Sequence, residues 1–144
     1  MMSAADPLSP QDAIIYLMVT ASAADGNIDD RELRTIGRVV RSFALFGPDD
    51  EARLVETSQA CGRIAAQDGG LGRIMQSAQS AIPPHLAETA YAAVIDVVAA
   101  DGGLVGAELR ILDMVRQTLH VSDEGASAIE RAARARNLTL DDVE

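Results

Sequence analysis

The sequence predicts an all-α protein, a compact bundle of about seven helices built from a duplicated helix–turn–helix unit. Three observations support this class. Apolar residues recur at helical spacing along most of the chain, and no alternating strand pattern occurs. The phrase Ala-Asp-Gly at residues 24–26 returns at 100–102, and each copy follows an apolar stretch. Pairing residues 16–40 with 92–116 aligns eight identical residues. The two stretches are therefore predicted to adopt the same structure.

The first unit carries clear helix-start and helix-stop signals. Residues 1–8 have no periodicity and are predicted to be a flexible tail, and residues 9–144 form a single domain. Ser9 is a predicted N-cap and Pro10 a first helical residue, which opens a helix that runs to about residue 24. Gly26 ends it, because glycine takes the left-handed conformation readily.

The second helix of this unit is predicted to begin with a capping box inside a hydrophobic staple. Asp29 is the N-cap and Glu32 the third helical residue, and Ile28 and Leu33 form the staple around them. The helix is expected from residue 30 to about 43. In the second copy Val105 stands at the cap position, where it has no side-chain acceptor.

The remaining elements follow from turn residues and periodicity. Gly47-Pro48 starts a helix over 49–66, and a helix over 71–82 ends at Pro83-Pro84. Three further helices are expected to reach residue 100, to span 106–119 and to span 122–136. Thr139 to Asp142 has the composition of another helix start. The duplication further predicts that 11–44 and 87–119 superimpose. The core-facing residues of the two pairs would then be Leu33, Ile36 and Val40 and, correspondingly, Leu109, Leu112 and Val115.

Composition limits the partners and the cellular compartment. The chain has 144 residues, 48% of them hydrophobic, which suits one domain. Its 22 acids and 12 cations, all arginine, give a net charge of −10, so nucleic acid is not an expected partner. One cysteine fits a reducing compartment, and no stretch is long enough to insert in a membrane. A cytoplasmic protein is expected.

The two acidic loops resemble half of a calcium-binding EF-hand. Asp25 and Glu32 match positions 5 and 12 of that loop, but positions 1 and 3 fall on Ala21 and Ala23. In the second copy these positions are also apolar. Calcium needs six to eight oxygen ligands, so neither loop forms an EF-hand alone.

The duplicated phrase also carries a family resemblance. Ala-Asp-Gly-x-Ile/Leu-x-x-x-Glu-Leu, occurring twice in a helical chain, resembles the TerB tellurite-resistance family. Residues 13–16, 88–92 and 129–136 extend the similarity over nearly the whole chain. The resemblance implies a compact helical domain, cytoplasmic residence, a stress-response setting and an acidic patch for a divalent cation. It implies no established reaction. Val105 and Gly106 depart from the family pattern in the second loop.

Two interpretations of the acidic residues remain open. If the repeated units pack about a pseudo-twofold axis, both loops can pool their carboxylates around a divalent cation such as Ca²⁺, Mg²⁺, Mn²⁺ or Zn²⁺. The candidate ligands are Asp25, Asp29, Glu32, Asp101 and Glu108. In the alternative interpretation these carboxylates only cap helices and close turns.

Other polar residues give weaker signals. Arg31, Arg34, Arg38 and Arg41 form one stripe on a helix, which is either solvated or docks an acidic partner. Asp96 interrupts an apolar helix at the position of Thr20 in the first unit, and it is expected to be either exposed or half-buried and hydrogen-bonded. Cys61 has the spacing of a core thiol.

The sequence thus favours a non-enzymatic binding module that acts through protein partners and can hold a cation. No nucleophile–base pair, open metal site or phosphate-cradling loop is recognisable. A purely structural interaction domain without metal is the alternative, and a hydrolase using the acidic cluster ranks third. The identity of the partners is not encoded in any motif, and a homo-oligomer is compatible with the sequence.

Overall fold

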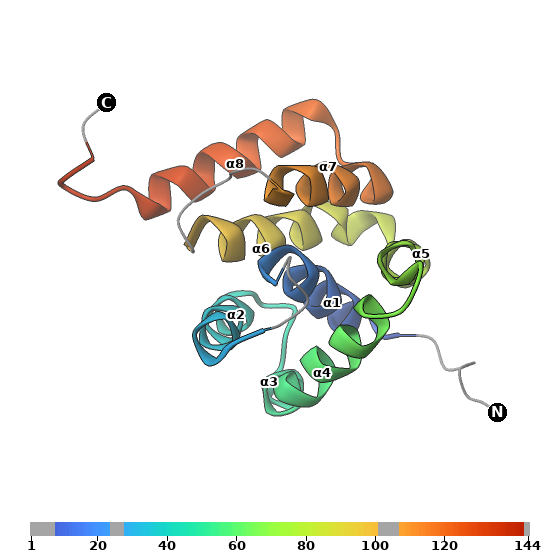
Figure 1. Cartoon of the computed structure of the whole chain (residues 1–144). Helices are drawn as coiled ribbons and strands as arrows, with labels where there is room; N and C mark the ends of the chain where they lie inside the picture. The colour runs from blue at the N-terminus through green and yellow to red at the C-terminus, as the bar shows by residue number, and fades with distance from the viewer. Residues whose placement is uncertain (1–7, 24–27, 101–106, 143–144) are drawn as a thin grey trace.

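The computed structural model describes residues 8–23, 28–100 and 107–142, together with all their side chains except those at 107 and 108 (Figure 1). Within these ranges the secondary structure is entirely helical, and the all-α prediction is confirmed. The elements are α1 (Pro10–Ser22), α2 (Asp30–Ser42), α3 (Pro48–Ala52), α4 (Leu54–Ala65), α5 (Gly70–Ala81), the 3₁₀ helix η2 (Pro84–Leu86), α6 (Ala87–Ala100), α7 (Ala107–Leu119) and α8 (Asp123–Asn137).

Helices α1 and α6 form the centre of the bundle. Every residue of α1 from Ala13 to Ser22 is buried, as are most residues of α6. A helix that is apolar on all sides is stable in water only when other elements surround it. Here α4 and α5 pack on α1, α8 packs on α6, and α1 and α6 contact each other. Figure 1 shows α1 between α6 and α4.

The contacts of α2 and α7 are reciprocal. Helix α2 packs on α6 as well as on α1, and α7 packs on α1 as well as on α6. Two equivalent helix pairs related by a pseudo-twofold axis would make this exchange of contacts. The arrangement supports the duplication, while close superposition of residues 11–44 on 87–119 stays a prediction.

One residue of the predicted core faces solvent. Leu109 is 48% exposed, although its counterpart Leu33 is partly buried against the core. Leu112 and Val115 are buried as expected. The buried face of α7 thus begins at Leu112, and the turn before it carries Leu109 outward. The prediction that Leu109 faces the core is wrong.

The helix predicted over residues 49–66 is interrupted at Arg53. Its backbone leaves the helical region at φ −96° and ψ 10°, which separates α3 from α4. The guanidinium donates to both carboxylate oxygens of Asp12 at 3.1 and 3.2 Å and to Asp50 at 3.4 Å. Asp12 raises the pKa of Arg53 through this hydrogen bond and its charge. The break therefore allows Arg53 to join the start of α1 to α3.

The turn between α4 and α5 depends on two glycines. Gly69 lies at φ 72°, in the left-handed region that residues with a Cβ rarely adopt. A Cβ on Gly70 would lie 1.9 Å from the carbonyl oxygen of Ile64. The glycine pair thus brings α5 directly against the end of α4, and α5 buries Ile74 and Met75 in the core.

No helix in the described part of the chain is long and apolar enough to span a bilayer. After α8, residues 139–142 form a turn, and no helix begins within these described residues.

Candidate functional site

The start of α2 contains the capping box that the sequence predicts. The backbone N–H of Glu32 donates to Asp29 Oδ1 at 2.8 Å, and the N–H of Asp29 donates to Glu32 Oε1 at 3.0 Å. Ile28 and Leu33 are partly buried against the core, as expected of the staple. Both carboxylates therefore satisfy backbone donors that the first turn of a helix leaves without an internal partner.

The other predicted cation ligands cannot be placed. Asp25 and Asp101 lie outside the described residues, as does the side chain of Glu108 at the start of α7. Among the side chains that the structure does describe, no three His, Cys, Asp or Glu residues gather in an arrangement suited to a metal ion. The five-carboxylate site thus stays a prediction, and Asp29 and Glu32 are the two members with an observed structural role.

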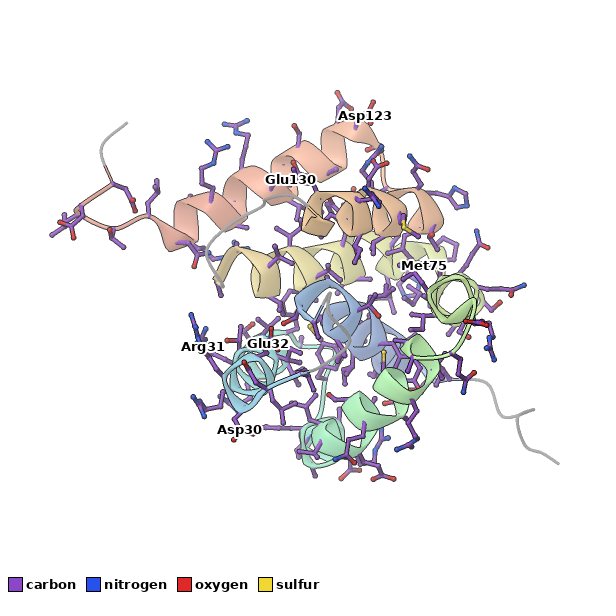
Figure 2. The ribbon with its side chains drawn as sticks, viewed as in Figure 1. Asp30, Arg31, Glu32, Met75, Asp123 and Glu130 are labelled. Carbon is purple, nitrogen blue, oxygen red and sulfur yellow. The ribbon has the colours of Figure 1, made fainter. Side chains whose placement is uncertain are left out.

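Helix α2 carries the predicted arginine stripe on its outer surface. Arg31, Arg34, Arg38 and Arg41 are all exposed, and Figure 2 shows Arg31 pointing away from the bundle. Arg41 donates to Glu51 of α3 at 2.6 Å. Within the described residues, neither Arg34 nor Arg38 forms an ion pair. The guanidinium groups of Arg34 and Arg38 are therefore available to another molecule.

A groove runs beside this stripe, between α2 and the start of α4. We call it the α2 groove. It has a volume of about 640 Å³, within the range of sites that bind small molecules or peptide side chains. Leu33, Leu54 and Val55 supply apolar surface, and Val55 is 52% exposed. Its lining residues are Asp30, Leu33, Arg34, Gly37, Arg38, Arg41, Glu51, Leu54 and Val55.

Comparison with known protein families identifies the fold. The family model described as Tellurite resistance protein TerB matches residues 11–131, most of the chain. The chain belongs to the TerB family. A search of curated proteins and a search of solved structures each found no match. The TerB match includes both Ala-Asp-Gly phrases, both central helices and the α2 groove, so the resemblance seen in the sequence is confirmed.

The cysteine of this TerB domain is a core residue. Cys61 is fully buried between α4 and α1, where its sulfur lies 3.5 Å from the carbonyl oxygen of Tyr16 and 3.7 Å from Thr20 Oγ1. Burial raises the pKa of Cys61 to about 11. Because the thiolate is the reactive form, this thiol is a poor nucleophile or metal ligand at neutral pH.

Asp96 proves to be a half-buried structural group. Its carboxylate accepts a hydrogen bond from Arg136 at 2.6 Å, which joins α6 to the last turn of α8. Of the two alternatives that the sequence predicts for Asp96, exposed or hydrogen-bonded, the second is correct. Arg136 is separated from Asp96 by 40 residues, so no local pattern identifies it as the partner.

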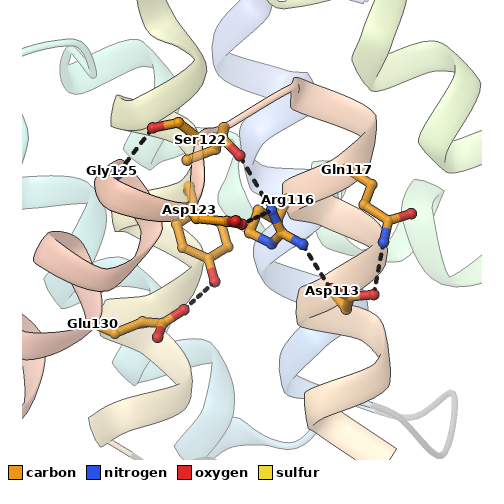
Figure 3. A network of polar contacts seen from close by, with 9 residues as sticks. Asp113, Arg116, Gln117, Ser122, Asp123, Gly125 and Glu130 are labelled. Atoms are coloured by element: carbon orange, nitrogen blue, oxygen red, sulfur yellow. Dashed lines mark hydrogen bonds and ion pairs between the residues drawn. The ribbon is translucent and has the colours of Figure 1, made fainter.

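The corner between α7 and α8 contains a polar network that sequence reasoning missed (Figure 3). Arg116 donates to Asp113 at 3.2 Å and to Asp123 at 3.0 Å, and thereby links the two helices. Nearby, the hydroxyl of Tyr91 donates to Glu130 at 2.6 Å. Burial and this hydrogen bond raise the pKa of Tyr91. The spacing of Arg116 from Asp113 was one local signal, since residues three apart share a helix face.

Proposed function

We propose that this TerB-family chain is a non-enzymatic cytosolic binding module that acts through protein partners. The observation that carries the proposal is the α2 groove, where apolar surface from Leu33 and Val55 lies beside Arg34 and Arg38. Exposed apolar surface rimmed by polar groups is typical of interaction sites. The groove is lined by three arginines and two carboxylates, a formal charge of +1 on a chain with a net charge of −10, so it favours an acidic partner with apolar side chains.

The chemistry of the other polar groups supports binding rather than catalysis. The thiol of Cys61 is buried with a raised pKa, and the carboxylates of Asp29 and Glu32 accept backbone hydrogen bonds. A catalytic role would require an activated nucleophile or base that faces a substrate. The family's stress-response setting is compatible with an adaptor that assembles other proteins. Because the chain has a net negative charge, we do not propose double-stranded DNA as a partner.

A divalent cation held by Asp25, Asp29, Glu32, Asp101 and Glu108 is a second proposal. The observation in its favour is that the capping box brings two of these carboxylates to the same turn of α2. Further acids from the two loops would complete the coordination sphere that Ca²⁺ or Mg²⁺ requires. A structural interaction domain without metal is the alternative.

A peptide-display selection tests the binding proposal. A random peptide library is selected on the wild-type protein and, in parallel, on the double variant Arg34→Glu/Arg38→Glu. The matched control is Arg63→Glu/Arg73→Glu, which changes the net charge equally at exposed residues of α4 and α5 outside the groove. We expect peptides with acidic and aliphatic residues to be enriched on the wild type and on the control. Equal enrichment on the groove variant, or no enrichment at all, would refute the α2 groove as a binding site.

A further inference from the structure

The segment after α8 presents two leucines to solvent. Leu138 is 58% exposed, and Leu140 is fully exposed. Figure 1 shows this segment leaving the end of α8 and extending away from the other helices. A fully exposed leucine is common singly, but two leucines followed directly by Asp141 and Asp142 form a compact acidic and apolar unit.

The same segment has a defined shape. The backbone N–H and the hydroxyl of Thr139 both donate to Asp142 Oδ2, at 2.8 and 3.2 Å. The N–H of Asp141 donates to Thr139 Oγ1 at 3.3 Å, and the N–H of Asp142 donates to the Thr139 carbonyl at 3.1 Å. These bonds close a turn in the segment that carries Leu140. A segment that is already ordered loses less conformational entropy when it binds.

The α2 groove has complementary chemistry. Its apolar surface, from Leu33, Leu54 and Val55, suits aliphatic side chains, and Arg34 and Arg38 suit carboxylates. We propose that the α2 groove of one molecule binds residues 138–142 of a second copy of this chain. This inference rests on the proposed function, because it names the partner of the groove that was assigned there as the binding site.

Charge distinguishes this groove from a second hollow that is lined by described residues. That hollow lies between the end of α2, α6 and α8, and its lining includes Phe43, Leu45 and Ile129. It is as large, at about 590 Å³, but the one charged residue in its described lining is Glu88. The carboxylate of Glu88 would repel Asp141 and Asp142 there. The α2 groove also has two carboxylates, Asp30 and Glu51, but Glu51 is paired with Arg41. Arg34 and Arg38, unpaired within the described residues, can therefore attract the two aspartates.

Reciprocal binding of the segment by two molecules gives a closed dimer. If each of two molecules places its segment in the groove of the other, the contact is symmetric and the assembly stops at two copies. The contact is small and partly electrostatic, so we expect a micromolar or weaker dissociation constant that increases with salt. Self-association should therefore depend on protein concentration.

The experiment uses the full chain and a labelled peptide. Sedimentation velocity compares the wild type with Leu138→Ser/Leu140→Ser, which alters only exposed side chains and is expected to fold normally. Fluorescence anisotropy follows a fluorescein-labelled peptide of residues 137–144 as it binds the wild type, Arg34→Glu/Arg38→Glu and the control Arg63→Glu/Arg73→Glu. A second peptide with serine in place of both leucines keeps the charge and removes the apolar side chains.

We expect the wild type to self-associate, and we expect both the wild type and the Arg63/Arg73 control to bind the peptide. The Leu138/Leu140 variant should remain monomeric, and the Arg34/Arg38 variant should bind the peptide at least about tenfold more weakly. A wild type that is monomeric up to about 1 mM, or a peptide that binds the groove variant equally well, overturns the inference. If the peptide-display selection yields ligands that need Arg34 and Arg38, but the 137–144 peptide does not bind, then the groove is a binding site and a second copy of the chain is not its partner. If neither occurs, both proposals fail.

Discussion

Replacing Glu32 with glutamine separates its role as a helix cap from a role as a cation ligand. The backbone N–H of Asp29 reaches Glu32 Oε1 at 3.0 Å, and glutamine offers a carbonyl oxygen at the same place. The capping box accepts either residue. In the presence of chelator, Glu32→Gln should therefore change the free energy of unfolding by about 0.5 kcal/mol or less.

The same capping box predicts a larger effect at its other member. Asp29 Oδ1 accepts from the Glu32 N–H at 2.8 Å, and alanine provides no acceptor for that donor. Asp29→Ala should therefore destabilise the protein by about 1 kcal/mol. Urea denaturation monitored by circular dichroism measures both changes. If Glu32→Gln is as costly as Asp29→Ala, the capping interpretation of Glu32 is wrong.

Adding a cation to the same proteins tests the second proposal. A cation at a hundredfold excess over its dissociation constant stabilises the folded state by about 2.7 kcal/mol. For a domain of this size the melting temperature would rise by roughly 5–10 °C. If the five carboxylates hold the ion, the rise should disappear in Glu32→Gln. Glu124→Gln is the matched control, because Glu124 is exposed in the first turn of α8. A wild-type melt that is unchanged by millimolar Ca²⁺, Mg²⁺, Mn²⁺ or Zn²⁺ refutes the cation proposal and leaves the cap intact.

Three further predictions concern the fold. Gly70→Ala should cost about 2–3 kcal/mol in urea denaturation, because its Cβ would lie 1.9 Å from a backbone oxygen of α4. Gly72→Ala should be neutral or stabilising by up to about 1 kcal/mol, because nothing lies within 4 Å of the added Cβ. If Gly70→Ala and Gly72→Ala had the same effect, the geometry of the turn would be contradicted. Burial raises the pKa of Cys61 to about 11, so the folded state keeps a proton that the unfolded chain loses above about pH 8.5. The free energy of unfolding of the wild type should therefore fall between about pH 9 and 11. The fall should be on the order of 2 kcal/mol larger than in Cys61→Ala. Parallel pH profiles for the two proteins would show that the pKa of Cys61 is not raised by folding. Arg136→Met should cost less than about 1 kcal/mol, because the Arg136 side chain that pairs with Asp96 is 54% exposed. A larger loss in thermal melts would show that this pair fixes α8.

Features that depend on neighbouring residues in the sequence could be predicted. The Ser9 cap, the Asp29–Glu32 capping box and the ends of most helices each involve residues at most four positions apart. These signals can be recognised in a short stretch of sequence, because the groups that cap a helix lie within its first turn. The core position of Cys61 also followed from helical spacing alone.

Features that depend on tertiary structure could not be predicted. The interruption at Arg53 involves Asp12, which is 41 residues away, and the partner of Asp96 is 40 residues away. The exposure of Leu109 depends on where α7 leaves the core, which its periodicity does not reveal. The arginine stripe of α2 was visible in the sequence. The groove beside it was not, because its other wall comes from α3 and α4.

We propose that this TerB-family domain binds its partner in the α2 groove. A titration of the ¹⁵N-labelled wild type with a display-selected peptide, followed by ¹H–¹⁵N correlation spectra, tests it most directly. The predicted result is a set of shifted amide signals concentrated in residues 30–41 of α2 and 51–55 at the junction of α3 and α4. Shifts confined to another face, such as the outer side of α8 around Ala132, would show that the partner binds elsewhere. Shifts that persist unchanged in Arg34→Glu/Arg38→Glu would likewise refute the groove as the binding site.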